Sequence, residues 1–323
     1  MSFRATDFHA SYSVAKPFTL PHHTRSMLRG VLGRALRQTG CAVVVTACVG
    51  ACARPEACTY ARLFDPLMPS PAPHRFLQGG TRAPPRLIPL LPAMGKAHLP
   101  PDDTSAPRHE DHPAQVFLAK NDRMTFGVRV LGELDDATDK CLMSALEGME
   151  TFPLGAEKGQ VKLESTTRHR TRTWPDGAEG APTAGSRVRV TFTTPAWIEH
   201  DGRLVKDLTF SRLFRAISRR VTTVGALYGE LGADQPDQEE TFVRLDALAG
   251  EVKTVETRLV RLQWVRHSEE SGARHPMHGF TGYAVFEGEV GELWPSLNMA
   301  EVAHVGKSTS FGLGRVRVDV EGG

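Results

Sequence analysis

The chain lacks long apolar runs, a strong net charge and more than a few cysteines. No apolar stretch reaches the roughly 18 residues that a membrane-spanning helix needs, and the N-terminal residues contain no apolar segment typical of a secretory signal. We therefore expect a cytoplasmic protein with no membrane partner. The net charge of +2 over 323 residues also means that overall electrostatics do not indicate a nucleic-acid partner.

Positive charge is nevertheless concentrated locally. Arginine and lysine gather in four short segments, at 25–37, 168–174, 210–220 and 315–318. Such patches, and not the global charge, would hold an RNA partner. The apolar content of 40% is adequate for packed cores, and the length indicates about two domains.

Four of the five cysteines lie within a short segment of the first half: Cys41, Cys48, Cys52 and Cys58. Four thiolates can bind zinc tetrahedrally, so a structural zinc ion is one interpretation. The spacing is not the paired pattern of two close cysteines and then two more, and the alternative is a group of small buried thiols under a loop. Disulfides are unlikely in a cytosolic chain.

The order of predicted elements is the same in the two halves. In the first half, alternating and helical patterns predict a strand over 3–17, a helix over 24–40, a short strand near 86–91, a strand over 124–134, a helix over 135–149 and a strand over 160–169. A proline-rich section at 66–113 interrupts this order. Strand, helix, two strands, helix, strand is the order of a ferredoxin-like domain.

The second half repeats that order after a turn-rich connector at 172–185. The predicted elements are a strand over 187–197, a helix over 208–229, strands over 257–268 and 279–286, a helix over 292–302 and a strand over 314–320. We therefore predict an α+β protein of two tandem ferredoxin-like (RRM-like, βαββαβ) domains. Residues 1–180 would carry the cysteine-rich and proline-rich insertion, and residues 186–323 a glycine-rich loop.

That loop is the segment HVGKSTSFGLG at 304–314. Glycine allows backbone N–H groups to approach a phosphate, and Lys307 adds positive charge. The loop is not a nucleotide-binding P-loop, because the lysine follows the first glycine and a strand follows the last. An extended polyanion is one predicted ligand, and a tight turn between helix and strand is the alternative. His304 could be catalytic, bind a phosphate, or hold the loop through its backbone.

His22 and His23 directly precede the first predicted helix. Unpaired N–H groups and the positive end of the helix dipole favour an anion there, so this is the best position in the chain for acid–base chemistry near a phosphate. Arg25 and Arg29 could hold that phosphate or form the solvated face of the helix.

Four stretches together resemble a known family: MLRGVLGRALRQTGC, CTYARLFDP, LTFSRLFRAISRRVTTVGALYG, and GFTGYAVFEGEVG followed by HVGKSTSFGLGRVRV. The chain resembles the CRISPR-associated endoribonucleases that process precursor CRISPR RNA, which belong to the RAMP superfamily. The resemblance implies tandem ferredoxin-like domains and metal-independent cleavage within the CRISPR repeat. It also implies retention of the product as guide RNA for an interference complex, with repeat RNA and effector-complex subunits as partners.

Such cleavage needs a base to deprotonate the ribose 2′-OH, an acid for the leaving 5′-oxygen, and positive charge near the phosphate. Because the family often places a catalytic histidine around the first helix, the resemblance implies His23 or His22 as base. Tyr12, on the preceding strand, could act as acid or orient the phosphate, and the alternative is a half-buried tyrosine of that strand. The expected RNA-binding residues are Arg25, Arg29, His304, Gly306, Lys307, Ser308, Gly312 and Gly314. No cofactor is expected for catalysis. A non-catalytic RAMP subunit and a zinc-stabilised scaffold protein are the alternative hypotheses.

Overall fold

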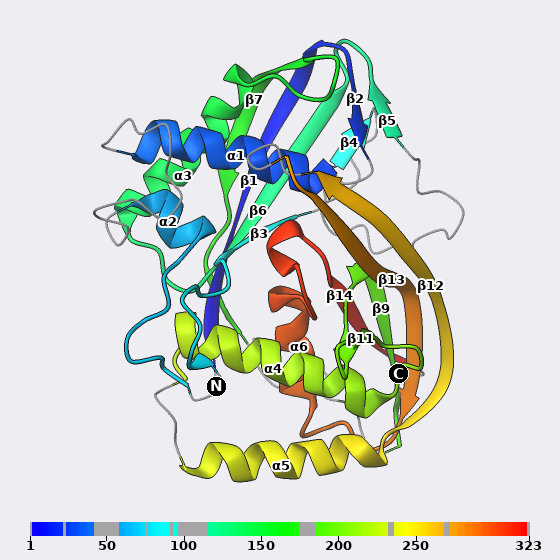
Figure 1. The fold of residues 1–323 in the computed structure, drawn as a ribbon. Helices are drawn as coiled ribbons and strands as arrows, with labels where there is room; N and C mark the ends of the chain where they lie inside the picture. Colours follow the sequence, from blue (N-terminus) through cyan, green and yellow to red (C-terminus); the bar gives the residue numbers. More distant parts are fainter. Residues whose placement is uncertain are drawn as a thin grey trace.

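A computed structural model describes residues 2–21, 24–41, 58–74, 77–90, 93–95, 115–174, 182, 185–231, 236–267 and 272–321. In these residues the chain forms two layered halves, one above the other in Figure 1. No helix in the described ranges has both the length and the apolar character needed to cross a membrane.

The N-terminal half is built around the long strand β1 (Phe3–Lys16). Its buried side chains alternate with more exposed ones, so Phe8, Tyr12 and Val14 face the core. The sheet is antiparallel and has the order β3-β6-β1-β7, formed with β3 (Leu87–Pro89), β6 (Arg123–Leu131) and β7 (Gln160–Arg168). Two short strands extend it: β4 (Ala93–Gly95) on β6, and β8 (Arg172–Trp174) on β1.

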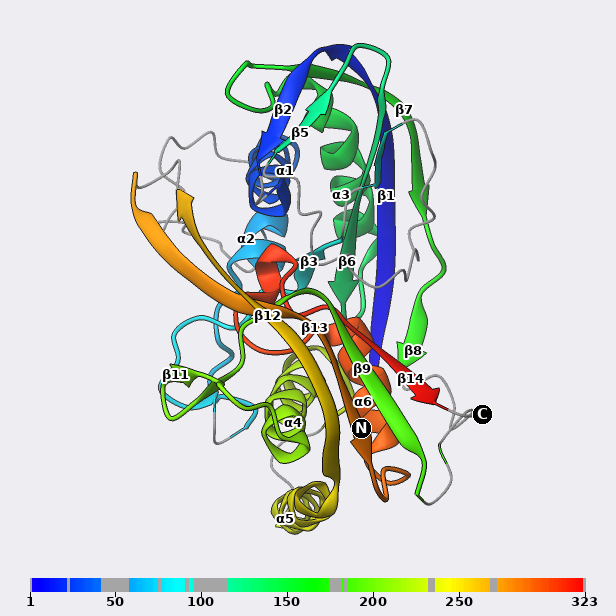
Figure 2. The ribbon, with the colours of Figure 1, turned by 90° about the vertical axis from the view of Figure 1, so that its right-hand side faces the viewer.

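Helices cover one face of this sheet, as Figure 2 shows. They are α1 (Thr24–Gly40), the short α2 (Thr59–Phe64) and α3 (Asp136–Gly148). Leu28, Leu32 and Leu36 recur every four residues on the buried side of α1. Asp135 caps α3 by accepting a hydrogen bond from the Thr138 N–H at 2.7 Å.

The C-terminal half repeats the plan. Its elements are β9 (Arg187–Ala196), α4 (Phe210–Tyr228), β12 (Lys253–His267), β13 (Arg274–Glu287), α6 (Trp294–Ala303) and β14 (Val316–Glu321). The strand order is β12-β13-β9-β14, which matches the order of the first half strand for strand. The predicted α+β class with tandem ferredoxin-like domains is therefore confirmed.

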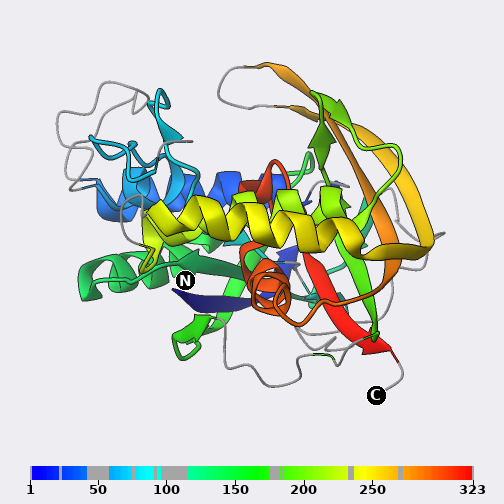
Figure 3. The same ribbon diagram turned by 90° about the horizontal axis from the view of Figure 1, so that it is seen from below.

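Several elements lie outside this repeated plan. The largest is α5 (Pro236–Glu251), which packs along α4 and is joined to it by an ion pair between Arg215 and Asp246 at 2.7 Å. Seen from below in Figure 3, α5 is the outermost layer. The smaller additions are β2 (Phe18–Pro21) with β5 (Gln115–Leu118), β10 (Glu199–His200) with β11 (Arg203–Leu204), and the 3-10 helices η3 (Met149–Thr151) and η4 (Thr309–Phe311).

The two halves share apolar contacts. Phe3, Ala5, Ile88 and Leu131 come from the N-terminal sheet yet belong to the apolar core of the C-terminal half. A packed apolar interface of this kind restricts domain motion, so the line of contact between the halves, here called the seam, has a defined geometry. The division into residues 1–180 and 186–323 stays a prediction.

Candidate functional site

The glycine-rich loop, defined here as 304–315, lies at the seam. Several of its backbone N–H groups donate to acceptors inside the protein. Lys307 N donates to the Trp197 carbonyl at 2.8 Å, Gly312 N to Thr309 at 2.8 Å and Gly314 N to Pro195 at 2.9 Å. At these three positions the structure gives no support to the expectation that backbone N–H groups bind a phosphate.

The backbone conformation and close packing of the loop explain why glycine occupies these positions. Gly306, Gly312 and Gly314 have φ values of +82°, +75° and +73°, a region that favours glycine. A Cβ atom on Gly314 would lie 1.8 Å from the Val305 carbonyl oxygen, and one on Gly312 would lie 2.5 Å from that of Pro89. The loop therefore packs backbone against backbone, and Gly312 does so against the N-terminal half.

His304 holds the loop from inside. It ends α6 with a φ of +61°, is only 1% exposed, and its Nδ1 lies 3.0 Å from the Leu313 carbonyl oxygen. Since a carbonyl only accepts, Nδ1 carries the proton in this bond. Burial and the nearby charge of Arg129 hold the His304 pKa well below its ordinary value, so the ring is neutral. Of the three roles open from sequence, the structure supports the loop-holding one.

The C-terminal end of α6 is held by two arginines from different halves. Arg220 Nε donates to the Ala303 carbonyl at 3.0 Å, and Arg129 Nη1 to the Val302 carbonyl at 3.4 Å. Cations are favourable at this negative end of a helix. Arg129 in turn forms a bidentate ion pair with Asp7, in which Nε and Nη2 each donate to a carboxylate oxygen at 2.7 Å. The loop is thus anchored to the N-terminal sheet.

Three further arginines, here called the arginine cluster, meet at the seam: Arg25 and Arg29 on α1, and Arg266 on β12. The guanidinium carbons of Arg29 and Arg266 lie 5.0 and 4.7 Å from the centre of the Phe311 ring, which therefore contacts both. The side chain of Arg25 packs against the loop at Gly312. A Cβ atom built on Gly312 would lie 2.6 Å from the Cδ atom of Arg25.

Arg25 and Arg266 have no counter-charge among the described residues, and the charge of Asp65 acts on Arg29 without an ion pair. None of its members forms an ion pair there, and the Nε atoms of Arg29 and Arg266 are buried without an acceptor. Burial lowers the pKa of Arg25 and of Arg29 to about 10, and lowers that of Arg266 as well. Partly buried cations without counter-charge are costly, and a bound anion would relieve that cost.

A pocket of about 200 Å³ opens beside the arginine cluster. Its walls come from the start of α1 (Arg25 and Ser26), from β12 (Trp264 and Arg266) and from Phe311. Sequence reasoning placed Arg25 and Arg29 correctly at the start of the first helix but missed Arg266 and Phe311. No local pattern could have found them, because they meet Arg29 only through the tertiary fold.

Lys307 belongs to the same loop but contacts Glu199 instead of the arginine cluster. Its ammonium forms a 2.5 Å ion pair with Glu199, whose carboxylate also accepts from the Trp197 indole at 2.8 Å. The Lys307 side chain is 59% exposed, so part of the ammonium stays open to a ligand while Glu199 neutralises its charge. Ser308 follows with a left-handed φ of +60°, and its carbonyl accepts the Phe311 N–H at 2.9 Å.

Tyr12 lies away from the seam. Its ring is fully buried in the N-terminal core, and its hydroxyl donates to the Leu146 carbonyl at 2.5 Å. Burial raises its pKa above the ordinary value, which makes it a poorer proton donor. We therefore withdraw Tyr12 from the catalytic set and assign it to the core. His22 and His23 lie outside the described residues.

The cysteine segment is described only at its two ends. Cys41 is half-buried and Cys58 is buried, and Cys48 and Cys52 lie outside the described residues. Cys141 comes close to the same place, with its sulfur 3.6 Å from the hydroxyl of Thr39. Within the described ranges, no three His, Cys, Asp or Glu side chains are grouped so as to hold a metal ion. The zinc interpretation stays a prediction.

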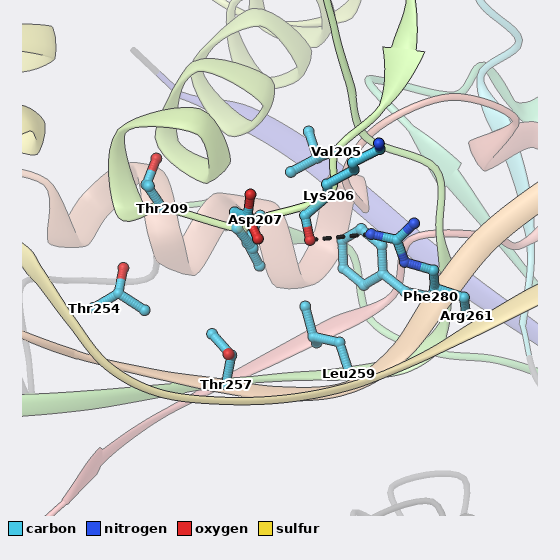
Figure 4. Close-up of a pocket in the computed structure, with 10 residues that line it drawn as sticks. Val205, Lys206, Asp207, Thr209, Thr254, Thr257, Leu259, Arg261 and Phe280 are labelled. Atoms are coloured by element: carbon cyan, nitrogen blue, oxygen red, sulfur yellow. Dashed lines mark hydrogen bonds between the residues drawn. The ribbon is translucent and has the colours of Figure 1, made fainter.

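A second pocket, of about 360 Å³, lies between the start of α4 and strand β12 (Figure 4). Arg261 on its rim donates to the Lys206 carbonyl at 3.1 Å, and Asp207 adds a negative charge beside these cations. This rim carries both signs of charge and includes none of the residues predicted for the site. Arg261 therefore serves as a matched control for Arg266, because both arginines belong to strand β12.

Two family models match different parts of the chain. A family model described as CRISPR-associated endoribonuclease Cas6 matches residues 190–316, which span most of the C-terminal half and the loop. A second model, described only as an N-terminal domain, matches residues 3–178. The C-terminal half of the chain thus matches the family of CRISPR-associated endoribonucleases named Cas6. A search of curated proteins found no match.

Solved structures share the Cas6-type fold at low identity. Cas6 of Thermus thermophilus is 14% identical with a TM-score of 0.52, over 98% of this chain and 99% of that one. A Cas6 product complex is 15% identical with a TM-score of 0.50, over 98% and 100%. A partial Cas6-RT-Cas1–Cas2 complex is 12% identical with a TM-score of 0.54, over 99% of this chain and 46% of that chain.

Proposed function

We propose that this protein is an endoribonuclease that cleaves precursor CRISPR RNA within the repeat and keeps the product bound as guide RNA for an interference complex. The observation that carries the proposal is the arginine cluster, whose three partly buried guanidinium groups form no ion pair with a carboxylate in the described chain. Cas6-type relatives solved as a product complex and as part of a Cas6-RT-Cas1–Cas2 complex support RNA and CRISPR-complex partners.

The chemistry needs only side chains. The ribose 2′-OH upstream of the cut attacks the phosphorus in line, a base takes its proton, and an acid protonates the 5′-oxygen that leaves. The products are a 2′,3′-cyclic phosphate and a 5′-OH, and DNA is no substrate because it lacks the nucleophile. Base, acid and positive charge can all come from histidine and arginine, so the proposed reaction requires no metal.

His23 or His22 is our choice for the base, because an imidazole is partly neutral at physiological pH. They directly precede Thr24, the first residue of α1. At about 3.8 Å per residue, the Cα of His23 is within about 8 Å of the Cα of Arg25. A phosphate held by the arginine cluster would therefore be within reach of a histidine side chain. With Tyr12 withdrawn, the second histidine is the candidate acid.

The test replaces His22 and His23 by alanine, singly and together, and measures cleavage and binding of repeat RNA separately. We expect cleavage to fall by about a hundredfold or more while binding is retained. His200→Ala, an exposed histidine on β10, is the matched control and should cut normally. Wild-type protein that binds the repeat but never cuts it would instead make this chain a non-catalytic RNA-binding subunit.

The zinc interpretation is tested independently. Elemental analysis of wild-type protein and of a Cys41→Ser variant measures bound zinc, and a gel shift with repeat RNA measures binding. Bound zinc without RNA affinity would favour the scaffold hypothesis over the ribonuclease. Cleavage that continues in EDTA is the result expected for the proposed mechanism.

A further inference from the structure

We infer that the 200 Å³ pocket beside the arginine cluster takes one unpaired base of the RNA, from the nucleotide next to the cleaved phosphodiester. This inference rests on the proposed function and names the form of substrate that the site accepts. It depends on three features of the pocket: its lining, its size and its position.

The lining has the composition of a base-binding pocket. Trp264, Met277, Phe311 and Leu313 supply apolar and aromatic surface, while Arg25 and Arg266 supply positive charge at the same opening. Aromatic walls with a few polar groups are what a planar base with an attached phosphate requires. The charge is also uncompensated in the described residues, so the pocket offers a cationic rim that a phosphate completes.

The size of the pocket suits a single nucleobase. Pockets for drug-sized ligands measure about 300–1,000 Å³, and this one is smaller, at about 200 Å³. A volume of this order suits a single base. The sugar and phosphate would therefore stay outside, where the guanidinium groups of Arg25 and Arg266 lie.

The position connects the pocket to the reaction. Arg25 and Ser26 form one wall, and they follow His22 and His23 within four positions of the chain. The opposite wall comes from the β12–β13 hairpin, through Trp264 and Arg266 of β12 and Met277 of β13. A base inserted between these walls would splay the backbone at its own phosphate. In-line attack by the 2′-OH needs such a departure from helical geometry.

The experiment measures coupling between a base and Trp264. Repeat RNA with a 2′-deoxyribose before the cut resists cleavage, so binding is measured alone. An abasic nucleotide is then moved through each unpaired position flanking the cut. For wild-type protein we expect one position at which base removal lowers affinity about tenfold. In Trp264→Ala the same removal should have no further effect, because the base has already lost its partner.

Val265→Ala, an exposed neighbour on the same strand, is the control and should behave as wild type. Phe311→Leu repeats the measurement if Trp264→Ala folds poorly. Equal base-removal effects in wild type and both pocket variants would overturn the inference while leaving the ribonuclease proposal intact. If wild-type protein does not bind repeat RNA at all, both the inference about the pocket and the ribonuclease proposal are overturned.

Discussion

The Nδ1 atom of His304 lies 3.0 Å from the carbonyl oxygen of Leu313, so the residue that ends α6 holds the far side of the glycine-rich loop. This contact is buried, and the ring is neutral. The loop is thus positioned by contacts within the protein, from both halves. The consequences for stability, for pH and for RNA binding can each be measured.

Replacing His304 by alanine should lower the free energy of unfolding by about 1–3 kcal/mol, because the Leu313 carbonyl loses its buried donor. The pH dependence has a definite sign. The folded-state pKa of His304 lies below the ordinary 6.5, so as pH falls the unfolded chain takes up this proton first. Its contribution is intact above about pH 6.5 and is lost below. Denaturant titrations at pH 7.5 and 5.5 should show a smaller acid loss for the variant than for wild type.

Arg266→Met should separate stability from function. A methionine keeps most of the side-chain bulk and removes a charge that has no counter-charge among the described residues, so the variant should be as stable as wild type or more stable, by up to about 1 kcal/mol. RNA affinity should fall, and the slope of log affinity against log salt should shrink by about one. Arg261→Met on the same strand is the control, with an unchanged salt slope. A strongly destabilised Arg266→Met would show that the arginine has a structural role.

The ion pair with Glu199 should reduce the contribution of Lys307 to RNA affinity. In Glu199→Gln the 2.5 Å ion pair is weakened, so Lys307 is freer to contact a phosphate and RNA affinity at low salt should rise a few-fold. Lys307→Ala should lower affinity. The two effects should not add, because the glutamine change acts through the lysine. An affinity gain that survives in the double variant would contradict this relationship.

Gly314→Ala should disrupt the loop, with a loss of more than about 2 kcal/mol in unfolding free energy, because the new Cβ meets the Val305 carbonyl and φ is positive. Gly30→Ala in α1 is the matched control. No atom lies within 4 Å of its new Cβ, so it should be neutral or stabilise by up to about 1 kcal/mol. Thermal unfolding of both variants checks the contrast.

Tyr12→Phe tests the assignment of this residue to the core. Losing the hydrogen bond to Leu146 should lower stability by about 1 kcal/mol, while the rate of RNA cleavage should stay at the wild-type value. A large drop in cleavage at unchanged RNA binding would return Tyr12 to the catalytic set.

The sequence predicted most of the fold because its apolar spacing is regular where elements are buried. The helix expected over 24–40 is α1, and the strand expected over 187–197 is β9. Helix α5 was missed because its apolar residues do not mark one face: Phe242 and Val243 are 43% and 60% exposed. Their outward position obscures the helical pattern that Leu245 and Leu248 would otherwise show.

The site was harder to predict for a different reason. Arg25 and Lys307 could be proposed from the sequence because charge beside a helix start or a glycine is a local signal. Arg266 was not, because arginines also occur elsewhere on β12, and only the fold brings this one to the Phe311 ring. Likewise, sequence could suggest that the glycines serve a phosphate, but only coordinates reveal the carbonyl groups that they approach.

Helix α5 has a practical consequence. It lies outside the repeated plan, at the end of the molecule opposite α1 in Figure 1. The described residues of the arginine cluster and the pocket come from other elements. A tether, dye or affinity handle attached to the exposed Ala247 or Gly250 would leave the seam facing free solution. Surface-immobilised or single-molecule measurements of this protein are best built from that helix.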